Sequence, residues 1–347
     1  MRKRQLKIIN KIMRIKYVFS LAILTGFTVY LFSCNKTNNP TLLGDWITKS
    51  EFNGLPRASA VSFVVNDIAY VGTGFNSSLL EYYNDFWKYD AKLNFWQQVA
   101  DFPGVPRSSA VAFAVNGKGY VGTGSDGNND LKDFYEYDPA KNTWKKIPDF
   151  GGSARHGAVA LGLGDYGYVG TGNDGSDLKD FWQYNPADTT WTEIPSFGGS
   201  KRQNGVAFVL NNKGYVLTGS HNGIYLNDMW ALNPTLLGQN TFPWEQKKNL
   251  DASTNYTIER EGACALVLGS DAYIAVGRQS SYISSTWHYL SSVDSWEAKT
   301  PFETTLRSDA ISFSTDGKAF VALGRNGSLF LDDTYQFDPN AQVVQGN

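Results

Sequence analysis

Cysteine is nearly absent from this sequence, and the shortage limits the covalent chemistry that the chain can support. Of the 347 residues only Cys34 and Cys264 are cysteines. Cys264 lies in the apolar run 263–268 (ACALVL), where a buried structural thiol is expected rather than a nucleophile. If Cys34 is modified, as argued below, no disulfide is available within the mature domain.

Positive charge is scarce beyond the first residues, and long hydrophobic runs are lacking. Seven of the 31 Lys and Arg residues precede residue 17, and the remaining 24 face 33 acidic residues, a balance of about −9. A protein that binds phosphate backbones needs clustered positive charge, so we expect no nucleic-acid partner. The longest apolar run, residues 17–32, is shorter than the roughly 20 residues that a membrane-spanning helix needs. A cationic segment followed by such a run is typical of a secretory signal.

The end of the apolar run, Leu31-Phe32-Ser33-Cys34, resembles a bacterial lipobox. The resemblance implies that residues 1–34 are a lipoprotein signal and that Cys34 becomes the lipid-modified first residue. The polar, Asn-rich residues 35–41 then form a flexible tether. No Asp follows Cys34 and no acidic cluster is present, which implies the periplasmic side of the outer membrane and leaves surface display open. We expect the protein to contact the membrane only through this lipid anchor.

What the sequence does contain is one unit of about 50 residues, present six times. Residues 112–144 show it best: an apolar run, an Asn-Gly turn, a run that ends in Gly-Thr-Gly, a polar loop, an aromatic strand and a tryptophan. The tryptophans are Trp46, Trp96, Trp144, Trp191, Trp244 and Trp296. An arginine opens each unit, namely Arg57, Arg107, Arg155, Arg202, Arg260 and Arg307. This period is typical of kelch repeats, in which each repeat is a four-stranded propeller blade.

The resemblance to kelch propellers extends over about residues 42–339 and predicts an all-β, six-bladed kelch-type β-propeller as one domain, residues 42–347. In each unit strand a follows the arginine, and strand d carries the tryptophan. The chain begins with an isolated d-type strand at residues 45–47 and ends after a c-type strand. We therefore predict that the N-terminal strand pairs with the last blade and closes the ring, leaving no open edge. The double glycine of the family is replaced by pairs such as Thr123-Gly124.

In kelch propellers ligands usually bind the face that carries the d–a and b–c loops, and the six arginines lie near it. Two interpretations of these arginines stay open: a ring of cations for an acidic ligand, or an ion pair repeated in every blade with the strand-c carboxylates. Other ligand-binding candidates on this face are Tyr82, Arg278 and Arg325. His156 and Glu261, which follow their arginines where other repeats have small residues or Gln, are weak catalytic candidates. Tyr83 and His221 belong to the same loops.

Three functions fit these observations. The first is a monomeric binding module that recognises a glycan or a protein of the cell envelope through the central funnel. The second is an enzyme similar to the N-acetylneuraminate epimerases, with Glu261 as acid or base and Arg202 or Arg307 holding a carboxylate. The third is an envelope scaffold or assembly factor.

Galactose oxidase also has kelch blades, but its copper site needs two His, two Tyr and a Cys. In this sequence His156, His221 and His288 occupy non-equivalent blade positions. No metal and no cofactor are expected. The insertion at residues 233–259 is a further candidate for binding.

Overall fold

The computed structural model describes residues 42–248 and 258–342. The predicted signal at residues 1–34, the lipidation site Cys34 and the tether at residues 35–41 lie outside the described residues. Part of the insertion, residues 249–257, lies outside them as well. Within the described ranges no helix combines the length and the hydrophobicity needed to cross a bilayer.

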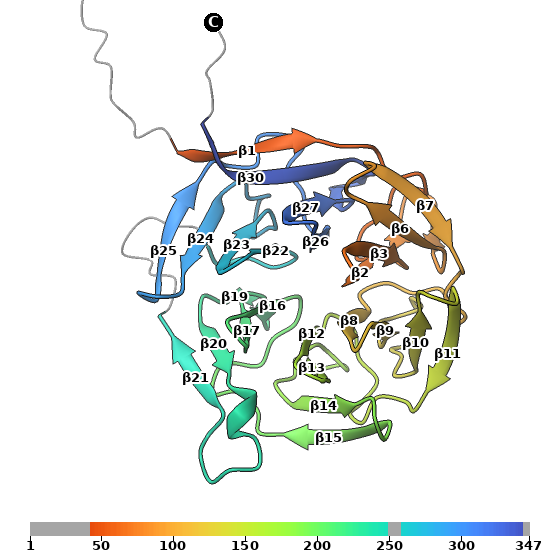
Figure 1. Cartoon of the computed structure of the whole chain (residues 1–347), viewed down its shortest axis with the longest axis vertical. Helices are drawn as coiled ribbons and strands as arrows, with labels where there is room; N and C mark the ends of the chain where they lie inside the picture. Colours follow the sequence, from red (N-terminus) through yellow and green to blue (C-terminus); the bar gives the residue numbers. More distant parts are fainter. Residues whose placement is uncertain (1–41, 249–257, 343–347) are drawn as a thin grey trace, which may run out of the picture. The chain divides into compact units, whose positions relative to one another are not determined.

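Six four-stranded antiparallel sheets stand around a common centre, each with strand a innermost (Figure 1). The strands of blades one to three, in the order a to d, are β2 (Val61–Val65), β3 (Ile68–Gly72), β6 (Phe86–Asp90), β7 (Phe95–Val99); β8 (Val111–Val115), β9 (Lys118–Gly122), β10 (Phe134–Asp138), β11 (Thr143–Ile147); and β12 (Val159–Leu163), β13 (Tyr166–Gly170), β14 (Phe181–Asn185), β15 (Thr190–Ile194). Those of blades four to six are β16 (Val206–Leu210), β17 (Lys213–Leu217), β20 (Met229–Leu232), β21 (Trp244–Lys247); β22 (Cys264–Leu268), β23 (Asp271–Ala275), β24 (Thr286–Leu290), β25 (Ser295–Lys299); and β26 (Ile311–Thr315), β27 (Lys318–Ala322), β30 (Thr334–Gln342), β1 (Leu43–Thr48).

The short remaining elements lie in the connections. The b–c loops of blades one, four and six are small hairpins, β4–β5 (Phe75–Asn76 and Glu81–Tyr82), β18–β19 (Ser220–His221 and Ile224–Tyr225) and β28–β29 (Arg325–Asn326 and Leu329–Phe330). Within the described residues, the insertion before Trp244 contains one 3-10 turn, η1 (Pro234–Leu236), in which the Thr235 N–H donates to the Asn233 side chain. Asn at an N-cap accepts from N–H groups that have no partner within the helix.

The predicted ring closure is confirmed. β1 pairs antiparallel with β30 and becomes strand d of the sixth blade, with Trp46 opposite Phe337. The Trp46 indole packs between Phe302 and Phe337 at ring-centroid distances of 4.8 and 4.7 Å, and its Nε1 donates to the carbonyl of Thr300 in blade five. The first and last strands of the propeller thus share one sheet, and the inner strands form a closed ring.

The repeated tryptophans join each blade to the one before it. In four further blades the indole Nε1 donates to a carbonyl at the end of the preceding strand d: Trp96 to Ser50, Trp144 to Ala100, Trp191 to Pro148 and Trp244 to Pro195. A tryptophan has a large apolar body and one donor, which suits a position that packs on one blade and bonds to another. The period of about 50 seen in the sequence is therefore the period of this contact between blades.

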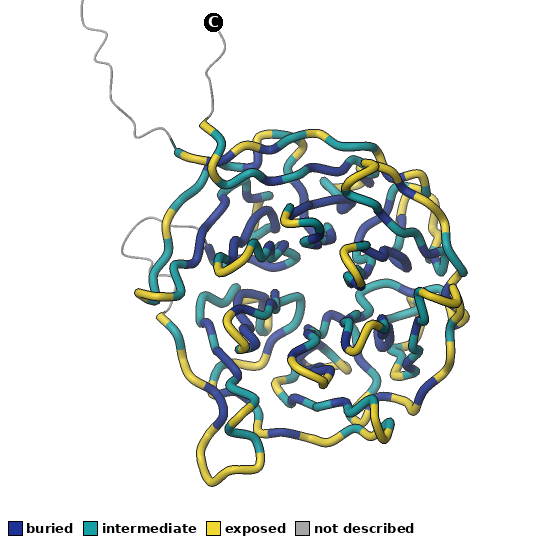
Figure 2. Tube along the Cα trace, viewed as in Figure 1, coloured by how far each residue is buried: buried dark blue, intermediate teal, exposed yellow. Residues whose placement is uncertain are grey.

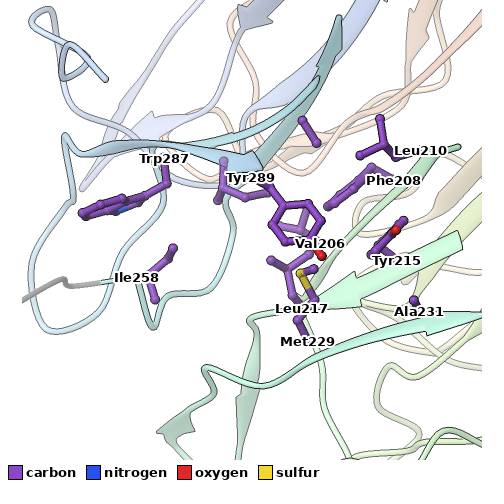
Figure 3. Close-up of a cluster of buried hydrophobic side chains, with 12 residues drawn as sticks. Val206, Phe208, Leu210, Tyr215, Leu217, Met229, Ala231, Ile258, Trp287 and Tyr289 are labelled. Carbon is purple, nitrogen blue, oxygen red and sulfur yellow. The ribbon is translucent and has the colours of Figure 1, made fainter. Parts of the chain in front are cut away.

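The core is divided into six apolar clusters, each of which joins two adjacent blades. Strand a buries alternate side chains, and Figure 2 shows burial concentrated in the inner strands while the outer loops are exposed. Figure 3 shows the cluster between blades four and five, where Phe208 stacks on Tyr215 with a centroid distance of 4.9 Å and Tyr289 approaches from the next blade. No blade buries its faces without its neighbours, which makes the ring the cooperative unit.

Closure by β1 predicts that replacing Trp46 with alanine destabilises the whole propeller. The change removes a buried indole and its hydrogen bond, and a loss of about 3–5 kcal/mol in the free energy of unfolding is expected. Urea denaturation followed by far-UV circular dichroism measures it. Phe242→Ala, at an exposed position of the insertion, is the control and should change stability by less than about 0.5 kcal/mol. Equal effects of the two changes would contradict closure through Trp46.

Candidate functional site

The face that carries the d–a and b–c loops, which we call the funnel face, is built on the six repeated arginines. All six are fully buried, with side-chain exposures of 0 to 1%. Five of them form ion pairs with the aspartate that precedes strand c, namely Arg57 with Asp85, Arg107 with Asp133, Arg155 with Asp180, Arg202 with Asp228 and Arg307 with Asp333. In blade five Arg260 instead donates to the carbonyl and hydroxyl of Ser285.

Two further hydrogen bonds to backbone carbonyls are the same in all six blades, and the five arginines with an aspartate partner also lie over a phenylalanine ring. In blade two, Arg107 meets Asp133 through both terminal nitrogens, at 2.6 and 2.8 Å, while Nε donates to the carbonyl of Val105. Nη1 also donates to the carbonyl of Thr123, and the guanidinium lies 4.8 Å from the ring centroid of Phe102. One arginine therefore ties together the d–a loop, the end of strand b and the start of strand c. Partial burial alone would raise the pKa of Asp133, but the hydrogen bonds and charge of Arg107 outweigh it and hold that pKa below its usual value.

The same contact explains the departure from the double glycine of kelch repeats. The residue whose carbonyl accepts from the arginine has a positive φ in every blade: Thr73, Thr123, Thr171, Thr218, Val276 and Leu323, between 52° and 62°. Glycine adopts this conformation freely, whereas a β-branched residue is strained in it. The arginine holds the carbonyl in place, so this chain keeps the geometry without the first glycine.

Ligand binding by the arginine ring stays a prediction, and these contacts give the arginines a structural role. The guanidinium groups of Arg57, Arg107, Arg155, Arg202, Arg260 and Arg307 point into the blades and are occupied by carboxylate, hydroxyl and carbonyl oxygens. Arginine's fork of donors serves here to join three segments of one blade. Of the two interpretations drawn from the sequence, the contacts favour the ion pair that is repeated from blade to blade.

A closed ring of backbone hydrogen bonds surrounds the mouth of the central channel. The ring is formed by the second residue after each arginine. Its N–H donates to the carbonyl of the corresponding residue in the preceding blade, at N···O distances of 2.8 to 3.1 Å. The six residues are Ser59, Ser109, Gly157, Asn204, Gly262 and Asp309, and all have φ between 52° and 62°. A Cβ on Gly157 would lie 2.6 Å from Oδ1 of Asn204, and one on Gly262 would lie 2.5 Å from Oδ1 of Asp309. The two glycines thus make room for the longer side chains of the next blade.

The channel behind this ring is lined by strand a and by the small residues directly before it, such as Ala60, Ala110, Ala158, Gly205 and Ala263. Its volume is about 260 Å³. Small side chains leave the backbone of the inner strands facing this space. Side chains that differ among the blades, and could therefore recognise a ligand, lie around the mouth.

Glu261 and Arg278 are engaged with each other at this mouth. Arg278 Nη2 lies 2.8 Å from Oε1 of Glu261, and the hydroxyl of Ser220 in the preceding blade donates to Oε2. The Glu261 side chain is 11% exposed and that of Arg278 is 38% exposed. Arg325 is also half-exposed and donates to Asp309 through Nε. Both oxygens of Glu261 therefore have partners, and ligand binding by Arg278 and Arg325 stays a prediction.

The two tyrosines of the first b–c loop are less accessible than expected. Tyr83 is buried, with its ring 4.1 Å from the guanidinium of Arg57. Tyr82 stacks on Phe75 with a centroid distance of 4.3 Å, and its hydroxyl lies close to Gly127 of the next blade. Neither ring is presented as a free stacking surface. Ligand binding by Tyr82 stays a prediction.

Two histidines of the funnel face are each held by an aspartate of the preceding blade. His156 Nδ1 lies 2.7 Å from Asp130, and His221 Nδ1 lies 3.1 Å from Asp177. His156 is half-exposed, and its assignment as an acid or base stays a prediction. The sequence pattern did not indicate Asp130 or Asp177, because the contact depends on which loops meet across a blade boundary. The repeat nevertheless holds a signal, since the two aspartates occupy equivalent b–c loop positions.

The other titratable groups singled out in the sequence lie away from the funnel mouth. His288 is buried in strand c of blade five, between Asp271 and Glu297 and stacked on Tyr273. Cys264 is buried, and burial raises the pKa of its thiol to about 12. Within the part of the chain that the structure describes, no group of three or more His, Cys, Asp or Glu side chains could hold a metal ion.

Six blades of four strands, closed by an N-terminal strand and tied by a repeated arginine, define a kelch-type β-propeller. The family model described as the KLHDC2/KLHL20/DRC7 Kelch-repeats domain matches residues 29–219, more than half of the 347-residue chain. The chain therefore belongs to this Kelch-repeat family.

Comparison with solved structures supports the same fold. The structure of YjhT is similar over 82% of this chain and 95% of that one, with a TM-score of 0.69 and 17% identity. In all, 668 chains of solved structures are similar to this protein, and no curated protein matches it. A likeness at this level of identity shows the fold alone, and so many chains share the fold that it decides little about function.

The buried ion pair predicts that removing its carboxylate is costly. Asp133→Ala leaves the charge of Arg107 buried without its main partner, and the free energy of unfolding should fall by about 3–5 kcal/mol. Asp149→Ala, which breaks an exposed pair with Lys146, is the matched control and should cost less than about 1 kcal/mol. Chemical denaturation of both variants checks the difference. A small effect at Asp133 would show that the pair does not carry the blade.

Proposed function

We propose that this protein is a binding module of the cell envelope and that its funnel face holds a partner protein through apolar side chains. The observation that carries the proposal is a group of exposed aliphatic residues on the loops of blades six, one and two. We call this group, Leu55, Leu79, Leu80, Val105 and Leu329, the apolar rim. Their exposed fractions range from 48 to 84%.

Hydrogen bonds between loops bring the residues of the apolar rim together. Asn76 Nδ2, in the loop of Leu79 and Leu80, donates to the carbonyl of Pro56 beside Leu55. The Ser78 hydroxyl donates to the carbonyl of Ser328, which precedes Leu329. The loop of Val105 joins the same loop on its other side, because the N–H of Arg107 donates to the carbonyl of Tyr83.

A group of exposed apolar side chains on neighbouring loops is typical of a protein interaction site. Burying each leucine contributes about 1.5–3 kcal/mol, which offsets part of the entropic cost of association. A glycan would need an aromatic ring with a free face, and Tyr82 and Tyr83 are packed against Phe75 and Arg57. The geometry therefore favours a protein over a glycan as the main ligand. An envelope scaffold would use the same rim.

A sugar epimerase is supported less well by the same residues. Such an enzyme needs a free acid or base next to a group that holds the sugar carboxylate. Glu261 is engaged by Arg278 and Ser220, and Arg202 and Arg307 are buried in their ion pairs with Asp228 and Asp333. Binding without catalysis is the simpler function for this arrangement.

The proposal predicts that a partner is captured from the apolar rim and not from the opposite face. A photoreactive p-benzoylphenylalanine at Leu55 should give a crosslinked adduct in the producing cells. Adding Leu80→Asp should lower its yield about tenfold, because a buried contact of at least about 1.4 kcal/mol is lost. Gel shift and mass spectrometry of the adduct measure this.

The matched control places the same probe at Leu93 or Val293, which are 73% and 67% exposed in the c–d turns of the opposite face. These positions should give no adduct with the same partner. Equal capture from both faces, or an adduct at residue 55 that is indifferent to Leu80→Asp, would count against the rim as the binding surface.

We further propose that the chain is anchored to the outer membrane by a lipid on Cys34, on the periplasmic side. Metabolic labelling with an alkynyl fatty acid should mark the protein, and Cys34→Ser should abolish the label and release the protein from the membrane fraction. Cys264→Ala is the control and should keep the label, since Cys264 is buried in the folded propeller. Labelling that persists in Cys34→Ser, or that needs Cys264, contradicts this anchor.

A further inference from the structure

A separate pocket lies on the funnel face between the third and fourth blades, away from the apolar rim. Its volume is about 350 Å³, and its walls are polar side chains and glycine. The residues that matter to the argument are Ser176, Asp177, Lys201, Gln203 and His221. A pocket without apolar walls excludes an apolar ligand, so the charges and hydrogen-bonding groups decide what fits.

The one carboxylate in the wall, Asp177, is withdrawn from the pocket. Its side chain is 3% exposed, and both oxygens are occupied. Oδ1 accepts from Asn173 Nδ2 at 2.8 Å, while Oδ2 accepts from the N–H of Asn222 at 2.9 Å and from His221. Burial alone would raise the pKa of Asp177, but these hydrogen bonds lower it. The carboxylate stays charged and serves to position His221 and Asn222.

The donors of the pocket, in contrast, are available. In the part of the chain that the structure describes, Lys201 takes part in no ion pair, and neither the side-chain amide of Gln203 nor the Ser176 hydroxyl has a hydrogen-bond partner, while the Ser176 backbone N–H donates to Asp174. Lys201 is exposed and lies directly before Arg202, the repeated arginine of blade four. The pocket thus presents the ammonium group of Lys201, the amide of Gln203 and the hydroxyl of Ser176 to a ligand. The negative charge of Asp177 is buried in the wall.

Comparison of the six repeats shows that the ammonium group is specific to this blade. The residue before each arginine is Pro56, Pro106, Ala154, Lys201, Glu259 and Leu306 in turn. Lys201 is the one cation at this position. Residues that build blades recur in every repeat, so a cation at a single position is not required by the fold.

We propose that this pocket binds a carboxylate group. One ammonium group matches one negative charge, and the amide of Gln203 and the hydroxyl of Ser176 are neutral donors for the second oxygen and its neighbours. A dianion such as a phosphate monoester fits less well, because the exposed carboxylate of Asp174 adjoins Gly175 in the wall. His221 is held through Nδ1 by Asp177, and its Nε2 lies 3.3 Å from Nδ2 of Asn222, so these two side chains form one ordered polar wall beside Lys201 and Gln203.

A sugar acid and the terminus of a peptide both carry this chemistry, and the experiment separates them. Saturation-transfer NMR on the full chain in detergent micelles compares glucuronate with glucose, and N-acetyl-dialanine with its amide. At least one of the two acids should bind, and its neutral counterpart should not. Lys201→Gln should weaken binding about tenfold, the loss expected for one charge-assisted hydrogen bond.

Lys179→Gln is the matched control, because Lys179 is exposed on the same b–c loop but does not line the pocket. It should leave binding unchanged, and Gln203→Leu should weaken it. Binding of neither acid, equal binding of the acids and their neutral counterparts, or indifference to Lys201→Gln would overturn the proposal. The site is independent of the apolar rim, so Leu80→Asp should not affect it and Lys201→Gln should not affect partner capture.

Discussion

The buried pairing of an arginine with an oxygen-rich partner is the interaction on which the rest of this propeller depends. A guanidinium with no exposed surface is tolerated only when its donors are satisfied and its charge is compensated. Here one side chain satisfies that demand by joining the d–a loop, strand b and strand c of its blade, as Arg107 does through Val105, Thr123 and Asp133. The roots of the funnel loops are thereby fixed in all six blades, while their tips are free to differ.

Much of the fold could be predicted from the sequence because it is repeated. Six tryptophans at a period of about 50 predicted six blades. The chain starts with an isolated strand around Trp46 and ends without a d strand, and this pattern predicted the closure of the ring. The same periodicity could not decide the role of the arginines, since it gives their place along the chain but not the direction of the side chain. The contacts of Asp130 with His156 and of Asp177 with His221 join different blades, and spacing within one repeat does not predict them.

The funnel face is chemically divided. Blades six, one and two carry the apolar rim, whereas the boundary between blades three and four carries Lys201, Gln203 and the His221–Asp177 pair. Between them, blade five places Glu261 and Arg278 in a mutual ion pair. A face of this kind can hold a partner by its apolar side chains and read a charged group at a second place, which gives orientation as well as affinity.

The ring of backbone hydrogen bonds around the channel mouth determines which substitutions the centre of the funnel face tolerates during evolution. Its six links use only N–H and carbonyl groups, so residues with different side chains form the same link as long as they tolerate positive φ. In this chain Ser59, Gly157, Asn204 and Asp309 occupy equivalent places in the same ring. Mutation can therefore change the chemistry at the centre of the funnel through residues that tolerate positive φ, such as Gly, Asn, Asp and Ser, at blades where the next side chain leaves room, while the six backbone links stay in place.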